Sequence, residues 1–482
     1  MKIRLEEIFY GATYNDFLMR PQHAVVKSRK VIDLTMPLSR NIDIAIPIVG
    51  ANMDTVTGEE MMKTLSLEGA FGFLDRNCSI EEEVRRVEYV KSQHSFVIEN
   101  PLIVHKKATM GEAKKLINEK NSSSILIEED AGNGVLAGIL SHRDMPAVNQ
   151  NEKLVTEFMT PFSEMITAKP GISMDEAEKL MFDNRIEKLP LIDSKRKVKG
   201  LITMRDLKMA KQKPYSSKDK KGRLLVGASI GAVGDYMERA EALIEAETDI
   251  ILMDIAHADS EVIREAVKNF RKKFGRFELA VGNVGTAEGA EFLAGLGVDA
   301  IKVGIGPGRG CRTRLETAAG VPQLQAVREA YLAVGGKVPI IADGGTKNDK
   351  DIFLAIATGA STVMQGSMLS GTDEAPGIIV EDPATRQKVK FYRGMTSPEA
   401  VVDGTKGETE EALSTPSEGQ SIRVPIVGSV VDILHRVKGH LQSSVSYAGE
   451  KDMVSAHKKI AKNPEKYLIK LSSASRAESF DR

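Results

Sequence analysis

The sequence predicts an α/β protein whose main domain is a closed (β/α)8 barrel with a smaller domain inserted into it. Short apolar runs of strand length alternate with helical patterns along most of the chain. A polar residue or a glycine follows nearly every apolar run, as in barrels that carry an active site at the carboxyl ends of their strands. An open, doubly wound sheet would give a similar pattern, but at least seven such units favour a closed barrel.

The first part of the predicted barrel lies in residues 1–98. Ile46–Val49 and Ala70–Leu74 are apolar runs that predict buried strands, and Glu59–Leu67 between them has helical spacing. A strand, a helix and a second strand in this order imply parallel neighbours in one sheet.

An internal repeat occupies residues 99–212. Thr109–Leu116 is matched by Ser173–Leu180, and Gly138–Asp144 is matched by Gly200–Asp206. Each repeat predicts a helix, two strands and a further helix. Two such units that bury a face against each other explain why the repeat is paired.

The second part of the barrel, in residues 213–482, begins with a polar and basic segment, Lys213–Gly222, which predicts an exit linker. Helical patterns such as Glu261–Lys273 and Ala287–Ala294 then alternate with strands. The predicted strands are Leu224–Ala228, Ile250–Met253, Leu279–Val281, Ala300–Val303, Ile340–Ala342 and Thr362–Met364.

The composition limits the classes of function. Sixty-six basic residues against 67 acidic ones give a net charge of −1, so no overall field attracts nucleic acid or an anionic membrane. The two cysteines, Cys78 and Cys311, do not suggest a disulfide framework, and a thiol enzyme belongs in a reducing compartment. The chain has no signal-peptide pattern and no run of 18 apolar residues, so we expect a cytoplasmic protein with no membrane or nucleic-acid partner.

The segment Lys302–Gln323, KVGIGPGRGCRTRLETAAGVPQ, carries the strongest functional signal. Alternate glycines over residues 304–310 follow a predicted strand, and Cys311 comes directly after them. Glycines allow successive backbone N–H groups to turn inward around a phosphate or carboxylate. A thiol beside such a site is placed to attack an electrophilic carbon. The alternative is a glycine-rich turn with a buried, inert cysteine.

This segment resembles the catalytic cysteine loop of the IMP dehydrogenase and GMP reductase family. The resemblance lies in GIGPG followed by Cys311, in Thr313 and Arg314, and in GVPQ at residues 320–323. It extends over the whole chain and implies a TIM barrel in which residues 99–212 are tandem CBS modules. Members of the family attach a cysteine to C2 of a purine nucleotide and move a hydride between C2 and a nicotinamide.

The resemblance implies a purine 5'-monophosphate as substrate and NADPH or NAD as cofactor, and it assigns site residues to both. The absence of a GxGxxG motif after a strand also argues against a Rossmann site. The expected catalytic residues are Cys311, Thr313 and Glu399. The expected substrate-binding residues are Asn52, Met53, Gly308, Arg309, Asp343, Gly345, Gly366, Ser367, Tyr392, Gly394 and Met395. The expected cofactor-binding residues are Asp254, His257, Asn283 and Gly304. A monovalent cation, K⁺, is expected on the backbone of Gly306, Gly308 and Cys311.

The choice between the two activities of the family depends on a flap, residues 396–418. Dehydrogenases of the family activate water there with an Arg-Tyr pair, whereas the flap of this chain contains neither residue. Glu399 lies one position past the acid of the reductases, and Asn52 also resembles reductases. Asp254–His257 and the inserted modules are closer to dehydrogenases. We therefore expect a GMP reductase, which converts GMP and NADPH to IMP and ammonia. The alternatives are an IMP dehydrogenase, which converts IMP, NAD and water to XMP, and a non-catalytic, nucleotide-binding regulatory paralogue.

Asp144 and Asp206 occupy the position at which CBS modules carry the acid that binds a nucleotide ribose. The resemblance therefore implies regulatory adenine or guanine nucleotides at the paired modules, and a homotetramer or octamer. The alternative is that both residues are N-caps of the last helix of each repeat.

Overall fold

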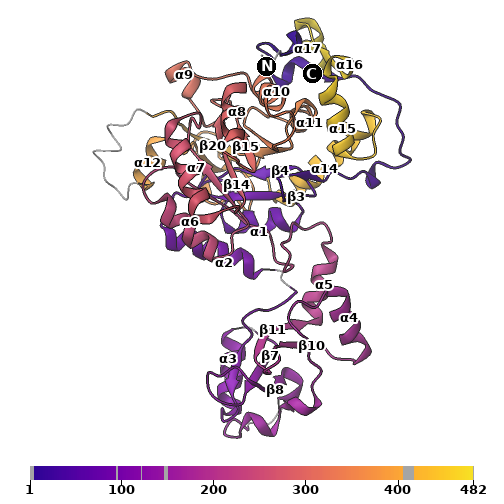
Figure 1. Cartoon of the computed structure of the whole chain (residues 1–482), viewed down its shortest axis with the longest axis vertical. Helices are drawn as coiled ribbons and strands as arrows, with labels where there is room; N and C mark the ends of the chain where they lie inside the picture. Colours follow the sequence, from indigo (N-terminus) through magenta and orange to yellow (C-terminus); the bar gives the residue numbers. More distant parts are fainter. Residues whose placement is uncertain (1–4, 94–95, 121, 146–149, 405–416, 481–482) are drawn as a thin grey trace. The chain divides into compact units, whose positions relative to one another are not determined.

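The computed structural model describes residues 5–93, 96–120, 122–145, 150–404 and 417–480. The chain divides into two compact units (Figure 1). The larger unit comprises Met1–Lys91, Tyr215–Asp219 and Leu224–Arg482, and the smaller one comprises Ser92–Pro214 and Lys220–Arg223.

The larger unit is built on a closed barrel of parallel strands, which confirms the predicted fold. Every strand of the barrel is almost fully buried, because the helices cover its outer face and side chains fill its interior. In their order around the barrel the strands are β12 (Gly227–Ile230), β13 (Ile250–Asp254), β14 (Leu279–Val284), β15 (Ala300–Val303), β16 (Ile340–Asp343), β17 (Thr362–Gln365), β4 (Ile48–Gly50) and β5 (Phe71–Leu74).

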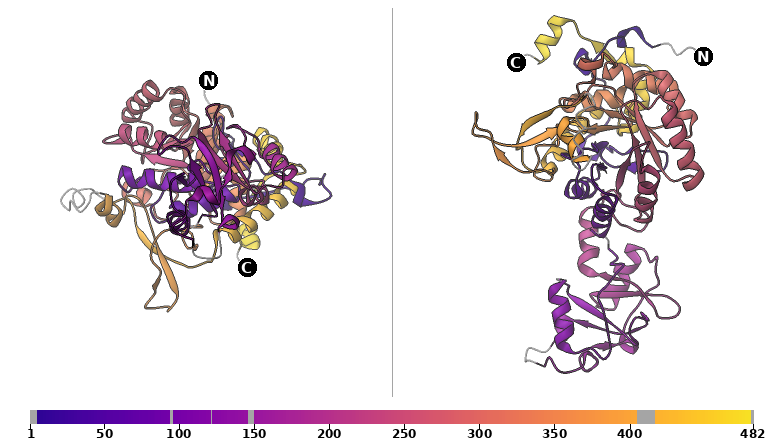
Figure 2. Two further views of the ribbon diagram at one scale, coloured as in Figure 1. Left: turned by 90° about the horizontal axis from the view of Figure 1, so that it is seen from below. Right: turned by 90° about the vertical axis from the view of Figure 1, so that its left-hand side faces the viewer.

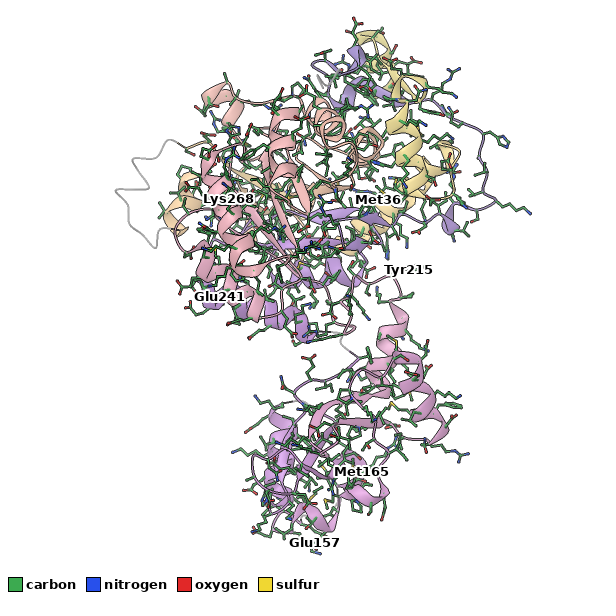
Figure 3. The ribbon with its side chains drawn as sticks, viewed as in Figure 1. Met36, Glu157, Met165, Tyr215, Glu241 and Lys268 are labelled. Carbon is green, nitrogen blue, oxygen red and sulfur yellow. The ribbon has the colours of Figure 1, made fainter. Side chains whose placement is uncertain are left out.

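Helices form the outer layer of the barrel (Figure 1). They are α1 (Glu59–Leu67), α2 (Ile80–Ser92), α6 (Tyr236–Glu245), α7 (Glu261–Phe274), α8 (Ala287–Gly295), α10 (Gln323–Val334), α11 (Asp349–Thr358) and α14 (Val430–Tyr447). In α7, Ile263, Val267 and Phe270 are buried at helical spacing, while Lys268 is exposed on the outer side, where Figure 3 labels it.

Further elements extend the barrel unit. An antiparallel sheet follows β17 and stands out from the barrel, as the orange strands of Figure 2 show. It consists of β18 (Val380–Glu381), β19 (Lys388–Arg393) and β20 (Ser421–Pro425), with α12 (Pro398–Gly404) between the last two. Two ends of the chain meet where β1 (Phe17–Met19) pairs with β21 (Leu468–Lys470). The remaining elements are β2 (Met36–Pro37), β3 (Asp43–Ile44), α9 (Thr313–Thr317), α15 (Met453–Lys462), α16 (Pro464–Tyr467) and α17 (Ser473–Phe480).

Part of the predicted exit linker belongs to the barrel unit. The backbone N–H and the hydroxyl of Ser217 donate to the carbonyl oxygens of Ser66 and Ala70, both at 2.8 Å. Asp219 forms an ion pair of 3.0 Å with the buried Lys91. The polar side chains of this part of the predicted exit linker, Lys213–Gly222, therefore satisfy groups at the edge of the barrel.

The smaller unit shows the internal repeat as two copies of one capping arrangement. Thr109 and Ser173 each accept a hydrogen bond from the backbone of the glutamate three residues later, and each glutamate bonds back to its cap. After the strand β8 the described residues of the first repeat form a 3-10 turn, His142–Asp144, at the start of the predicted second helix. The elements are β6 (Ile103–His105), α3 (Met110–Glu119), β7 (Ser124–Glu128), β8 (Leu136–Ser141), β9 (Thr160–Pro161), α4 (Met174–Asp183), β10 (Lys188–Ile192), β11 (Val198–Thr203) and α5 (Met204–Gln212).

Within the described ranges, none of the helices has the length and hydropathy needed to span a bilayer.

The close packing of β12 against β5 makes a testable prediction. A Cβ atom on Gly227 would lie 2.6 Å from Cδ1 of Phe73 and 2.8 Å from the carbonyl oxygen of Gly72. We expect Gly227→Ala to lower the free energy of unfolding by about 1–3 kcal/mol through overpacking. The control is Gly439→Ala in the exposed middle of α14, where a Cβ meets nothing within 4 Å. This change should raise the free energy of unfolding by about 0.5–1 kcal/mol. Thermal unfolding of both variants measures the difference, and equal midpoints would contradict the prediction.

Candidate active site

A cavity of about 1240 Å³ opens at the carboxyl ends of the barrel strands. All of the expected substrate-binding residues line it, and so do Cys311, Asp254, Asn283 and Gly304. The structure therefore brings together residues that are scattered from the first barrel strand to the strand β19. They meet because the loops that follow parallel strands of a barrel share one rim.

Three of the expected residues do not line this cavity: Thr313, which lies beside Cys311, Glu399 and His257. Glu399 is exposed in the first turn of α12, and its neighbours Ala400 and Val401 line the cavity instead. The helical period thus places Glu399 on the exposed side of α12. His257 is exposed as well, because the loop after β13 turns away from the cavity beyond Ala256.

Cys311 lies at the end of the glycine loop, next to a hydroxyl and a carboxylate. Its Sγ atom is 3.1 Å from Oγ1 of Thr313, and this hydroxyl donates a hydrogen bond of 2.7 Å to Oε2 of Glu418. Because the Thr313 hydroxyl donates to Glu418, its oxygen is left to accept the proton of the thiol. The three side chains form a continuous path for a proton from sulfur to carboxylate, which we call the thiol relay.

Glu418 is the functional residue that the sequence analysis missed. The backbone places it: the N–H of Arg312 donates to the carbonyl oxygen of Glu418 at 2.7 Å, and the N–H of Gln420 donates to that of Gly310 at 3.0 Å. These bonds pair the end of the flap with the cysteine loop in an antiparallel manner. The only signal in the sequence is that Glu418 is the acidic residue that closes the flap before Gly419.

The second thiol has a different environment. Cys78 also lines the cavity, but its Sγ atom donates toward the carbonyl oxygen of Asp75 at 3.8 Å. Burial, and next the Asp75 carboxylate, raise the pKa of the Cys78 thiol to about 12. Since the thiolate is the reactive form, this raised pKa disfavours Cys78 as a nucleophile.

The glycine loop needs glycine where it meets the strand β16. Gly304 has a φ of +151°, and a Cβ atom there would lie 2.1 Å from the carbonyl oxygen of Asp343. Gly308, Gly345 and Ser367 reach the same cavity from three consecutive loops. This arrangement of small residues is typical of the phosphate site in the late loops of a barrel.

A buried polar cluster forms the floor of the cavity. The ammonium of Lys302 lies 3.0 Å from Asp254 and 2.8 Å from Asp343. Asn52 donates to Asp254 at 2.7 Å, and Asn283 donates to Asp343 at 2.9 Å. Burial lowers the pKa of Lys302, but the two carboxylates outweigh it, so the pKa is raised above its usual value. The lysine is therefore charged at neutral pH.

The strand β19 supplies the opposite wall through Tyr392. Burial, and then the negative charge of Asp343, raise the pKa of Tyr392, so its phenol is neutral. The phenol lies close to Gly366, where a Cβ atom would stand 2.8 Å from Oη. Arg393, next to it, forms an ion pair of 2.6 Å with Asp54 and so fixes β19 to the loop after β4.

A match to known proteins accounts for this geometry. Residues 11–481 match the family model described as the IMP dehydrogenase / GMP reductase domain. The chain belongs to this family. Membership confirms the family that the cysteine loop predicted, and the protein is an NAD(P)-dependent oxidoreductase.

Relatives in this family carry both names. The chain is 41% identical over 476 residues to the inosine-5'-monophosphate dehydrogenase of Nitrosopumilus maritimus (strain SCM1), covering 97% of each chain. It is 38% identical to that of Aquifex aeolicus (strain VF5), covering 93% of this chain and 91% of the relative. Among solved structures, it is similar to a variant of the Trypanosoma brucei GMP reductase in complex with guanosine 5'-monophosphate. That likeness has a TM-score of 0.86 at 36% identity and covers 97% of both chains.

The predicted monovalent cation stays a prediction. The part of the chain that the structure describes contains no cluster of three or more His, Cys, Asp or Glu side chains that could hold a metal ion. A cation of this kind would instead be held by backbone carbonyls of the cysteine loop. One of these, the carbonyl of Gly308, already accepts the N–H of Cys311 at 3.1 Å.

The thiol relay separates the roles of two flap glutamates. We expect Glu418→Gln to lower kcat by about 10² to 10⁴, the usual contribution of a general acid or base, because an amide cannot take up the thiol proton. KM should change little. Glu399→Gln, an exposed acid of the same flap, is the matched control and should leave kcat within about threefold of the native value, as for surface changes. Steady-state kinetics test this, and a larger loss in Glu399→Gln would restore the original assignment.

Proposed function

We propose that the protein is a GMP reductase, which converts GMP and NADPH to IMP, ammonia and NADP⁺. The observation that carries the proposal is the thiol relay of Cys311, Thr313 and Glu418 at the end of a flap without Arg or Tyr. A reductase has to protonate a leaving amine, whereas a dehydrogenase has to deprotonate water. The relay can hold a proton taken from the thiol, and the flap lacks the pair with which dehydrogenases of the family activate water.

The relay balances the first half of the reaction. The proton of Cys311 passes through the Thr313 hydroxyl to the Glu418 carboxylate, and the thiolate attacks C2 of GMP. The same proton returns to the exocyclic nitrogen, the C2–N bond breaks, and ammonia leaves a purine bonded through C2 to sulfur. No external acid is needed, because substitution of the amine by the thiol consumes one proton and releases one.

The second half restores the thiol. Bound NADPH supplies a hydride to C2. The C2–S bond then breaks, IMP forms, and Cys311 leaves as a thiolate that regains a proton from solvent. The neutral Tyr392 and the small residues Gly308 and Gly345 contribute by holding the purine edge and the phosphate, so that C2 stays next to sulfur.

The cavity rim offers a group for the cofactor's additional phosphate. Arg76 lines the cavity, is exposed, and makes no hydrogen bond or ion pair within the described residues. A free guanidinium is well suited to bind a phosphate dianion. This observation favours NADPH over NADH.

An IMP dehydrogenase is the second candidate, and specific observations favour it. The relatives of highest identity given above are named inosine-5'-monophosphate dehydrogenase, and the carboxylate of Glu418 is also able to accept a proton from water through Thr313. A non-catalytic paralogue is disfavoured because the nucleophile and its relay are intact.

One assay separates the candidates. We expect the purified enzyme to convert GMP with NADPH at least ~100-fold faster than IMP with NAD, because loss of a dedicated base costs about 10² to 10⁴ in rate. Nicotinamide absorbance follows both reactions, and Cys311→Ala is the control that should abolish either. Faster formation of XMP would show that the dehydrogenase assignment is right. A lack of both activities would support the paralogue.

We also propose a regulatory purine nucleotide site in the smaller unit, at Asp144 and Asp206. These residues are not N-caps as the alternative supposed. Ser141 and Thr203 occupy the cap positions. The hydroxyl of each donates a hydrogen bond to the carboxylate of the aspartate three residues later in the chain. The half-buried Lys188 lies within electrostatic range of both aspartates, and burial lowers its pKa. A Trypanosoma brucei GMP reductase of TM-score 0.76 and 33% identity, in complex with guanosine 5'-triphosphate, supports such a ligand.

The regulatory site predicts a nucleotide-dependent stability. GTP or ATP should raise the unfolding midpoint of the full chain, because a ligand that binds only the folded state stabilises it. Asp206→Asn keeps an acceptor for the Thr203 hydroxyl but removes the charge, and should reduce this shift. The control is Glu176→Gln, which changes the corresponding capping partner of α4 and should leave the shift intact. Equal shifts in all three proteins would contradict a site at Asp206.

A further inference from the structure

Lys302 is a lysine within an apolar barrel strand, and its side chain is only about 4% exposed. Its ammonium contacts two carboxylates, Asp254 at 3.0 Å and Asp343 at 2.8 Å. All three side chains line the cavity that contains Cys311. Burying a charge is costly unless it is paired and hydrogen-bonded. A buried cluster of charged side chains at the cavity is therefore expected only if the carboxylates have a role in binding a ligand.

The hydrogen bonds divide the carboxylate oxygens in a specific way. In Asp254, Oδ1 faces Lys302 and Oδ2 accepts from Asn52. In Asp343, Oδ2 accepts from both Lys302 and Asn283, so Oδ1 has no hydrogen bond in the described part of the chain. The ammonium thus fixes the orientation of both groups and leaves Asp343 with an oxygen for a ligand hydroxyl.

The balance of charge shows what the ammonium does. One positive charge faces two negative ones, so the cluster is held together only while Lys302 is present. Without it, two partly buried carboxylates would remain close to each other, and burial and like charge both raise the pKa of a carboxyl group. A protonated carboxyl accepts fewer hydrogen bonds, and a ribose diol needs an acceptor for its two hydroxyl protons.

We propose that Lys302 is a positioning residue that holds the carboxylates of Asp254 and Asp343 aimed into the cavity, so that one buried ammonium supports both ribose sites. The inference rests on the proposed function and on the binding roles that the family resemblance implies, in which Asp343 binds the ribose diol of the purine nucleotide and Asp254 binds that of the nicotinamide. It applies equally to GMP with NADPH and to IMP with NAD, because each of these ligands carries the diol concerned.

The first variant is Lys302→Met, which keeps the length of the side chain and removes its charge. The matched control is Lys91→Met. Lys91 is also buried and also pairs with two carboxylates, Asp219 at 3.0 Å and Asp249 at 2.7 Å, but none of these three lines the cavity. Both variants should unfold at lower temperature. Only Lys302→Met should weaken the binding of GMP and of NADPH, measured separately by calorimetry as dissociation constants.

The pH dependence distinguishes positioning from packing. In Lys302→Met the raised carboxyl pKa should increase the dissociation constants of GMP and of NADPH by about tenfold or more near pH 6.5. Each unit of pKa corresponds to about a tenfold change in the ionised fraction of a carboxyl group. The loss should shrink as the pH rises toward about 9, when both carboxyls ionise again. A lysine that only fills space would give a loss that is the same at every pH.

The other titratable or charged groups around the cluster do not produce this trend. Tyr392 is in range of Asp343, and its raised pKa keeps it neutral throughout the experiment. Arg309 and Cys311 interact in turn with Tyr392. Any effect of these two groups cancels, because each dissociation constant is expressed relative to that of the native protein at the same pH.

Two double variants provide a rescue that does not depend on the stability of the single one. The double variant Lys302→Met with Asp254→Asn has no second carboxylate to repel the negative charge of Asp343. GMP should therefore bind with a dissociation constant within about threefold of the native value, while the binding of NADPH should remain weak. In the double variant Lys302→Met with Asp343→Asn, the binding of NADPH should recover and the binding of GMP should remain weak. Absence of this crossed rescue, or native affinities in Lys302→Met itself, would overturn the proposal. If the enzyme proves to be a dehydrogenase, IMP and NAD replace these ligands and the same crossed pattern decides.

Discussion

The cavity of this enzyme depends on one buried ammonium. The carboxyl ends of β13, β15 and β16 bring Asp254, Lys302 and Asp343 together below the substrate space, and the lysine neutralises part of a negative charge that the barrel could not otherwise hold. Asn52 and Asn283 complete the cluster from β4 and β14. Five of the eight strands therefore end in one polar network, which fixes the acceptor groups before any ligand arrives. Such preorganisation reduces the free-energy cost of ordering the side chains of the site when a ligand binds.

The reacting thiol depends on a different part of the chain. The cysteine loop comes from the barrel, but the acid of the thiol relay comes from the end of the flap, and two backbone hydrogen bonds join them. Any movement of the flap thus changes the environment of Cys311 directly.

The segment of chain that returns from the repeats is anchored within the barrel unit. The returning segment Tyr215–Asp219 belongs to the barrel unit and is fixed by Ser217 and by the pair of Lys91 with Asp219. Lys91 lies near the end of α2, and the first residues of that helix line the cavity.

The sequence by itself determined the barrel, the repeat, the candidate nucleophile and most of the residues that line the cavity. These follow from local patterns, since burial sets the period of strands and helices and the residue after each barrel strand must lie at the rim.

The sequence did not determine which flap acid reaches Thr313. Glu399 was chosen by its position in the chain, whereas the rotation of α12 exposes it and the pairing of residues 417–420 with the cysteine loop brings in Glu418. His257 likewise does not line the cavity, because the direction of a loop depends on what it packs against. Lys302 was hidden in an apolar run, and only the closure of the barrel shows that its charge meets two carboxylates from other strands. Contacts between distant segments depend on the packing of the whole chain, and a local pattern carries no record of them.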